Sequence, residues 1–338
     1  MRPPCLLTET ICASAPGRAG IIGNPTDMYS GSVISCSVGE RAYCRLSPSD
    51  QMVLTVGDDS EVIHDLSCLY CDIGPLQIVK AALEAMDIDP ADHKFSMRVW
   101  TDVPERAGLG GSTSMLSCVV GCLLAYLNLD LNKYETAEMI RKIEADIMKV
   151  TCGYQDSYMA VFGGLNYMDF RNKAWMRQSP DEPYATIEPL ADMVRELPMI
   201  LAHTGIKHCS NSVHQSLRER WQEGERSVVE GYRRIGELGR LGKKALLAHD
   251  WEILGELMNE NHAIQRDLGG SGESNEALIR AAMENGALGA KLAGAGGGGT
   301  IIALAENPRE MGEVLLEAGA DRVFGLMPSE GLIVEREL

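Results

Sequence analysis

The sequence predicts a two-domain α/β protein. The chain has 338 residues, enough for about two domains of ordinary size. Near residue 95, alternating apolar and polar residues are followed by glycines and then by a long apolar stretch, which indicates a strand, a loop and a helix. Residues 177–186 are rich in proline and charge, as boundaries between domains often are. We therefore expect one domain over residues 1–180 and another over residues 181–338.

Charge and composition narrow the class of partner. The formal net charge is −17, whereas surfaces that bind nucleic acid need clustered lysine and arginine, and an anionic membrane would be repelled as well. No stretch reaches the ~20 apolar residues that span a bilayer. Ten cysteines occur without the apolar core of a signal peptide, so we expect a cytoplasmic protein with reduced thiols. The sequence predicts no oligomeric state.

The N-terminal residues 12–39 have the pattern of a strand, a loop and a second strand. Arg18, Asn24 and Asp27 lie near turn signals, so we expect them on or beside loops rather than in a core. Charged residues among such small ones suggest a polar pocket, although a surface loop explains them equally well. The elements expected next are strands near 41–47 and 51–56 and a helix from Pro75.

A glycine loop precedes the helix that is expected over residues 112–127. Glycines at 108, 110 and 111 let backbone N–H groups approach a bound oxygen closely. The first turn of the helix adds unpaired N–H donors and the positive end of its dipole, and Ser112 and Thr113 add hydroxyls. These features indicate a phosphate site. The alternative is a tight turn that caps a buried helix, since that helix is apolar on nearly every side.

Two acidic residues follow this helix. In the helix expected over 134–149, Glu144 shares a face with Ile140 and Ile147, so it needs a cation or a hydrogen-bond partner, whereas Asp146 is expected in solvent. Asp156 comes at the start of a further helix. Aspartate is common in the first turn of helices, so the sequence alone leaves a structural and a functional role equally open.

The second half is predicted to begin with a strand near residue 199. A long helix from Val213 to Leu241 and a helix capped by Asp250 follow. Glycines at 294, 296 and 299 form a G-x-G-x-x-G pattern, but a strand, not a helix, follows at 300–304, which argues against a dinucleotide fingerprint.

Three segments resemble, in order, the motifs of one kinase superfamily: PGRAGIIGNPTD, PERAGLGGSTS and KLAGAGGGGT. That superfamily comprises galactokinases, homoserine kinases, mevalonate kinases and phosphomevalonate kinases (GHMP). Asp156 with Gly163-Gly164 resembles its catalytic aspartate segment. Within the superfamily, Gly-Asn-Pro-Thr-Asp at 23–27 and Gln155-Asp156 are most similar to glucuronokinases. The resemblance implies a two-domain α/β kinase with its active site in the cleft between the domains.

The resemblance also implies roles for individual residues. Catalysis falls to Asp156 with Arg18, and Mg²⁺ to Ser112 and Glu144. The implied nucleotide-binding residues are Pro104, Gly108, Leu109, Gly110, Gly111, Ser112 and Thr113. The implied substrate-binding residues are Asn24, Asp27, Gly296 and Gly297. Two departures stand out: Gly111 replaces the first of two usual serines, and Asn24-Pro25 replaces the Glu-His of galactokinases.

The function so implied is transfer of phosphate from ATP to the anomeric hydroxyl of a reducing sugar, with glucuronate preferred. Kinases of another sugar (heptose, galactose or fucose) or of an alcohol such as mevalonate are alternatives. A non-catalytic sensor of sugar and ATP is an alternative of another class. A uronate needs a nearby cation, for which Arg106, Arg171 and Lys207 are candidates.

Overall fold

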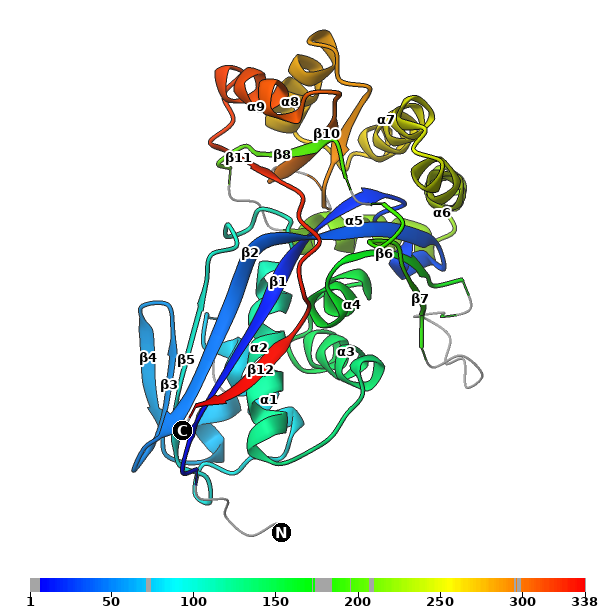
Figure 1. Ribbon diagram of the computed structural model, residues 1–338. Coiled ribbons are helices and arrows are strands. Elements are labelled where there is room, and N and C mark those ends of the chain that lie inside the picture. The colour runs from blue at the N-terminus through cyan, green and yellow to red at the C-terminus, as the bar shows by residue number, and fades with distance from the viewer. Residues whose placement is uncertain are drawn as a thin grey trace.

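The structure is a computed structural model that describes residues 7–70, 74–171, 173, 184–194, 196–206, 210–294, 296 and 299–337. It has a large and a small β-sheet, each covered by helices (Figure 1). The large sheet has the order β12-β1-β2-β5-β3-β4, with β6 paired to β2 and β7 to β6. Its strands are β1 (Thr10–Ile22), β2 (Ser32–Pro48), β3 (Met52–Val56), β4 (Asp59–Ile63), β5 (Phe95–Thr101), β6 (Leu165–Asp169), β7 (Thr186–Pro189) and β12 (Ile333–Glu337).

The strand β2 differs from the prediction, which divided it into two strands. It continues through Gly39 and Glu40 because β1 runs beside it over most of its length, with irregular register near Arg18 that lets the pair bend. On its other edge, β2 pairs with β6 at residues 32–36 and, beyond the bend, with β5 at residues 42–48. Two short 3₁₀ helices, Thr26–Tyr29 and Leu66–Tyr70, follow β1 and β4.

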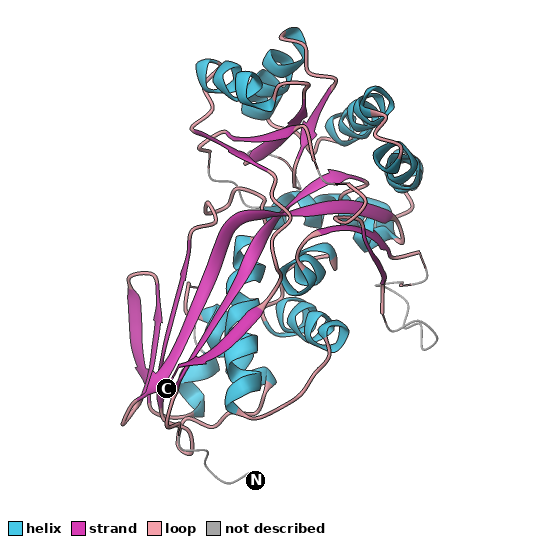
Figure 2. Cartoon of the chain, in the orientation of Figure 1, coloured by secondary structure: helices cyan, strands magenta, loops and turns pink. Residues whose placement is uncertain are grey.

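Four helices lie on one face of the large sheet (Figure 2). They are α1 (Gln77–Ala85), α2 (Gly111–Tyr126), α3 (Lys133–Lys142) and α4 (Gln155–Phe162). The central helix is α2, which packs on β1 and β2 and is buried on nearly every side, as its sequence predicts. Val119 and Leu123 of this helix join Leu46 and Val99 of the sheet in one apolar core.

The small sheet has the order β11-β8-β10-β9. Its strands are β8 (Met199–His203), β9 (Gly289–Leu292), β10 (Thr300–Leu304) and β11 (Arg322–Gly325), and α8 (Glu273–Glu284) and α9 (Pro308–Glu317) pack on it. Between the sheets, α6 (Arg226–Leu247) contacts β2 and α7 (Trp251–Asp267) contacts β9. Because β9 and β10 form a hairpin, the glycines between them are not the loop of a dinucleotide-binding unit.

The long helix predicted from Val213 to Leu241 is wrong. The structure has two helices there, α5 (Ser210–Gln222) and α6, and Gly224 between them has a φ of +76°, which a continuous helix does not allow. The cap at Asp250 is confirmed, because its side chain accepts a hydrogen bond from the backbone N–H of Ile253 at 3.1 Å.

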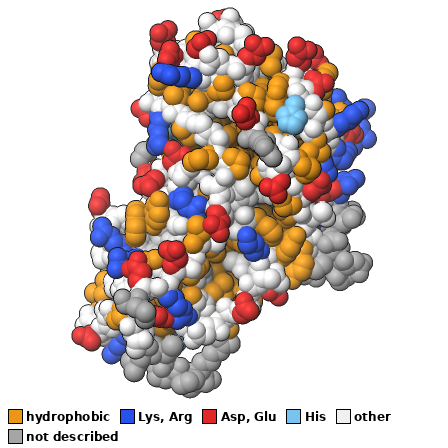
Figure 3. Space-filling model, in the orientation of Figure 1, with side chains coloured by type: hydrophobic (Ala, Val, Ile, Leu, Met, Phe, Trp, Pro, Cys, Tyr) orange, Lys and Arg blue, Asp and Glu red, His pale blue; other side chains and the backbone are white. Residues whose placement is uncertain are grey.

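The division at residue 180 stays a prediction, because residues 174–183 lie outside the described part of the chain. Two strands beyond it, β7 and β12, belong to the large sheet. No helix in the described part of the chain is long and apolar enough to cross a membrane. On the face drawn in Figure 3, basic side chains are interspersed with acidic ones.

Candidate active site

The centre of the site is an ion pair between Arg18 and Asp156. Nη2 of Arg18 lies 2.6 Å from Oδ1 of Asp156, and its Nε donates to the same oxygen at 2.7 Å. Nη1 of Arg18 donates to the carbonyl of Gly108 at 2.5 Å. One guanidinium thus connects β1, the first turn of α4 and the glycine loop. The expectation that Arg18 lies on or beside a loop rather than in a core is wrong: Arg18 lies within β1 and is only 8% exposed.

The glycine loop supplies backbone donors beside this pair. Gly108 and Gly110 each have a φ of +74°, and Gly110 is the N-cap of α2 without any side-chain cap. A Cβ added to Gly110 would lie 3.5 Å from Oδ2 of Asp156 and 3.4 Å from Cγ of Arg18. The uncapped N-terminus of α2 therefore lies against the ion pair, where its N–H groups suit an anion such as phosphate.

A second glycine loop packs against the first. A Cβ on Gly294 would lie 2.4 Å from the carbonyl oxygen of Gly108, and one on Gly299 would lie 2.6 Å from that of Ala107. Such contacts are possible only between bare backbones. Gly296 is also buried, whereas Gly297 lies outside the described residues. The candidate site is therefore located where the parts of the protein around the two sheets meet.

Glu144 is buried next to the start of α2. It belongs to a π-helical turn, Ile143–Ile147, that continues α3 where the prediction had a plain helix to residue 149. Its Oε1 accepts a hydrogen bond from Oγ1 of Thr113 at 2.6 Å. Burial raises the pKa of Glu144 to about 7, although the bond from Thr113 opposes this. The inward position of Glu144 and the exposure of Asp146 confirm the helical-face prediction.

These oxygens suit a hard cation. The structure brings Thr113, rather than the expected Ser112, into contact with Glu144, and the side chain of Ser112 is exposed. A carboxylate and a hydroxyl match the ligands that Mg²⁺ prefers, and a cation would offset the cost of a buried charge at Glu144. Among the described residues, no three His, Cys, Asp or Glu side chains form a metal-binding group. Phosphate oxygens and water would have to complete the coordination.

Asp27 holds the segment that carries Asp156. It is 4% exposed, and its Oδ2 accepts hydrogen bonds from the backbone N–H groups of Tyr154 at 2.7 Å and Gln155 at 2.9 Å. Burial raises the pKa of Asp27, while the bond from Gln155 opposes this. Asp27 lies in a 3₁₀ turn, as expected of a residue on or beside a loop, but it is buried and not at the surface.

Asn24 is also buried, and it contacts a lysine that the sequence analysis missed. Its Oδ1 accepts a hydrogen bond from Nζ of Lys291 at 2.8 Å, and its Nδ2 donates to the carbonyl of Gly294 at 3.3 Å. Burial, together with repulsion from Arg18, lowers the pKa of Lys291 to about 7. A lysine at an inward position of an apolar strand beside a glycine loop was the signal that could have identified it.

The remaining predicted residues are two members of the glycine loop and the three candidate cations for a sugar carboxylate. Leu109 is buried and its carbonyl accepts a hydrogen bond from the backbone N–H of Arg18 at 2.8 Å, and Pro104 begins the turn of the same loop. Among the candidate cations, Arg106 is exposed and Arg171 is paired with Asp169 at 2.6 Å. Lys207 lies outside the described residues.

Comparisons with known proteins identify the family. Residues 76–164 match the profile of the GHMP kinases N terminal domain, and residues 243–321 match that of the GHMP kinases C terminal. The chain belongs to the GHMP kinase superfamily. This GHMP kinase is 28% identical to Glucuronokinase 1 of Arabidopsis thaliana over 331 residues, 92% of this chain and 89% of the relative. It is 27% identical to the mevalonate kinase of Pyrococcus abyssi, over 97% of this chain and 99% of the relative.

Solved structures show the same fold. The galactokinase of Lactococcus lactis complexed with galactose superimposes on this GHMP kinase with a TM-score of 0.78 at 21% identity, covering 97% of this chain and 95% of the other. The prediction of an α/β GHMP kinase fold is thereby confirmed. As a GHMP kinase, the protein is a phosphotransferase that takes phosphate from ATP and acts on a small molecule, a sugar or another alcohol.

Proposed function

We propose that this GHMP kinase transfers the γ-phosphate of ATP to the anomeric hydroxyl of glucuronate and forms glucuronate 1-phosphate. The observation that carries the proposal of catalysis is the Arg18–Asp156 pair against the uncapped N-terminus of α2. The similarity to Glucuronokinase 1 supports the choice of sugar. A non-catalytic sensor would have no use for a carboxylate placed in this way.

In this proposal, the chain positions the reactants and offsets their charge. Backbone N–H groups at residues 108–113 hold the ATP phosphates. Because Arg18 engages Oδ1 of Asp156, Oδ2 on the side of Gly110 is left to accept the hydrogen of the sugar hydroxyl. The guanidinium of Arg18 stabilises negative charge on the phosphoryl group during transfer.

Glu144 and Thr113, with Ser112 as the residue implied by resemblance, would hold Mg²⁺ beside those phosphates. When bound, the ion supplies charge neutralisation for phosphoryl transfer. The hydrogen bond from Thr113 keeps the carboxylate of Glu144 turned toward the first turn of α2. The positive charges of Arg141 and Arg18 lower the pKa of Glu144 and so favour the carboxylate form that binds a cation.

The surroundings of Asn24 are compatible with an acidic sugar. Galactokinases carry glutamate at this position, and that charge would repel a sugar carboxylate. Here the side chain is neutral, and Nζ of Lys291, whose pKa burial lowers to about 7, lies 2.8 Å from its Oδ1. The neutral side chain at this position therefore permits a uronate without requiring one.

The proposal is tested by measuring ATP consumption with glucuronate, galacturonate, glucose, galactose, mannose, fucose, a heptose and mevalonate. Glucuronate is expected to give the highest kcat/KM, with phosphate on the anomeric carbon by ³¹P NMR. Asp156→Asn is expected to keep ATP binding and to lower kcat about 10²-fold or more. A neutral sugar that wins tenfold, about 1.4 kcal/mol in the transition state, would refute the glucuronate assignment. ATP binding without turnover on any acceptor would favour the sensor.

A further inference from the structure

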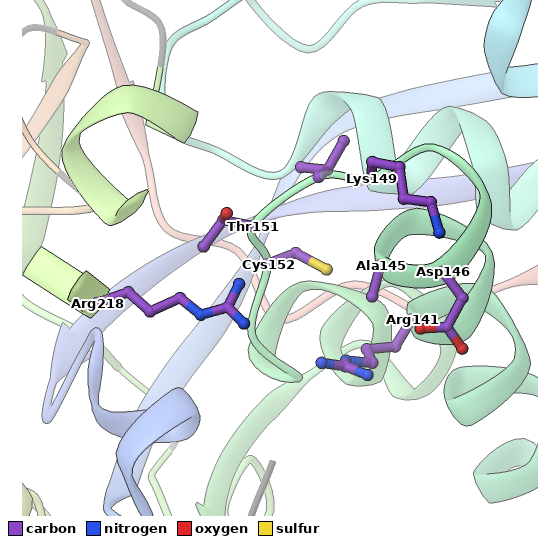
Figure 4. A pocket seen from close by; sticks show the side chains of 8 residues that line it. Arg141, Ala145, Asp146, Lys149, Thr151, Cys152 and Arg218 are labelled. Carbon is purple, nitrogen blue, oxygen red and sulfur yellow. The ribbon is translucent and has the colours of Figure 1, made fainter. Parts of the chain in front are cut away.

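A pocket of about 330 Å³ lies beside the catalytic segment (Figure 4). Its charged lining residues are three basic side chains, Arg141, Lys149 and Arg218, and one acidic side chain, Asp146. Asp146 and Lys149 are exposed, whereas Arg141 and Arg218 are partly buried. The excess of positive charge is unusual in a protein whose net charge is −17. It indicates a site for an anion.

The two arginines approach the pocket from different elements. Arg141 comes from the end of α3 and Arg218 from α5, and Figure 4 shows their guanidinium groups pointing toward one another. Burial, and then repulsion from Arg141, lowers the pKa of Arg218. Arg141 stacks over the ring of Tyr154 at 4.8 Å, and its Nε is buried without a hydrogen bond to any described residue. Two partly buried cations that face each other gain stability when an anion binds between them.

The pocket is continuous with the catalytic segment. Its wall includes Thr151 and Cys152, and the chain continues through the turn that Asp27 anchors to Asp156. Burial, and then the nearby carboxylate of Glu144, raise the pKa of the Cys152 thiol; Asp156 and Asp27 add to the effect. A group bound in the pocket therefore lies near the residues that we assign to catalysis.

We infer that Arg141 and Arg218 form the subsite that binds the carboxylate of the acceptor sugar. The inference deepens the proposed function and rests on its assignment of an acidic sugar. A guanidinium presents two parallel N–H donors to a carboxylate, so one group can be held from two sides. Lys291, another buried basic residue near the site, does not line this pocket, and its Nζ contacts the oxygens of Asn24, Gly20 and Leu292.

The experiment compares wild type with Arg141→Gln and Arg218→Gln, and uses Arg309→Gln as the control for loss of a charge. Arg309 is on α9, and its side chain is 91% exposed. Kinetics are measured with glucuronate, glucose and glucose 6-phosphate, and glucuronate binding is measured separately by calorimetry without ATP. Each pocket variant is expected to lower kcat/KM for glucuronate about 10- to 100-fold, mainly through KM, as expected for a lost charged hydrogen bond. KM for ATP and kcat/KM for glucose should change less than about threefold.

The outcomes separate this inference from the proposed function. If wild type uses glucuronate and the pocket variants behave like Arg309→Gln, the subsite is wrong and the glucuronate assignment stands. If wild type prefers glucose 6-phosphate and the pocket variants lose that activity, the arginines bind a phosphate, which overturns the carboxylate and the glucuronate assignment together. Arg218→Lys, which keeps the charge but not the two parallel donors, is expected to retain part of the glucuronate activity. Circular dichroism of each variant verifies folding.

Discussion

Replacing Glu144 with glutamine is expected to stabilise the ligand-free protein at neutral and alkaline pH. Glu144 is 5% exposed, and burial raises the pKa of its carboxyl from the ordinary 4.5 to about 7. Between these values the unfolded chain has lost the proton while the folded protein retains it, so stability falls as pH rises. Above pH 7 the cost is complete, and the difference in pKa corresponds to roughly 3 kcal/mol. Glutamine has the same shape, still accepts from Thr113 and removes this cost.

The assay is urea unfolding of wild type and variant between pH 4.5 and 8.5. Their free energies of unfolding should agree near pH 4.5 and differ by about 3 kcal/mol at pH 8. Asp146→Asn removes an exposed carboxylate two residues away and should show no such trend. With Mg²⁺ and ATP present, wild type should regain stability relative to Glu144→Gln, since a carboxylate binds the cation more strongly than a neutral amide does. A difference that does not change with pH would refute the reasoning.

Three further substitutions test the roles of other residues. Asp27→Ala should lower the free energy of unfolding by about 2–4 kcal/mol, because it leaves two buried N–H groups without an acceptor. Asp27→Asn, which keeps an acceptor oxygen, should retain most of the wild-type stability. Equal losses of stability in the two variants would contradict the anchoring role. Ser112→Ala should raise the Mg²⁺ concentration for half-maximal rate, and Thr113→Val should raise it more; the reverse order would exclude Thr113 as the main ligand. Gly110→Ala should lower kcat/KM for ATP at least about tenfold. The control is Gly57→Ala, which is also at positive φ but has open space around it and should only cost about 1 kcal/mol of stability. If the two variants had similar kinetics, the glycine loop would tolerate a side chain.

Local patterns predicted those parts of the site that depend on neighbours in the sequence. The spacing of apolar residues in the predicted helix placed Glu144 on its inward face, and the glycines predicted the loop before α2. The same patterns placed Arg18 on a loop, because turn signals surround it, whereas its strand is maintained by pairing with β2 and by the ion pair to a residue 138 positions away. Burial of a charge by a distant partner leaves no trace in the local sequence.

Long-range packing also explains what the sequence analysis missed. Arg141 lies one helical turn before Glu144 and could have been found from that spacing. Arg218 could not, because only the packing of α5 near residues 150–152 brings it to the pocket. The resemblance implied Ser112 as the hydroxyl beside Glu144, and only the packing of α2 near the π-helical turn shows that Thr113 makes the contact.

The pairing of β12 with β1 has a consequence for how the protein is made. Residues 10–14 pair with residues 333–337, so the outer edge of β1 remains open while nearly the whole chain is being synthesised. An open edge can recruit strands from other nascent chains. Arg18 lies further along the same strand, where β2 and not β12 is its partner, so β12 completes only the beginning of β1. A chain that ends before residue 333 would contain every proposed site residue but would lack the strand that completes the sheet beside β1.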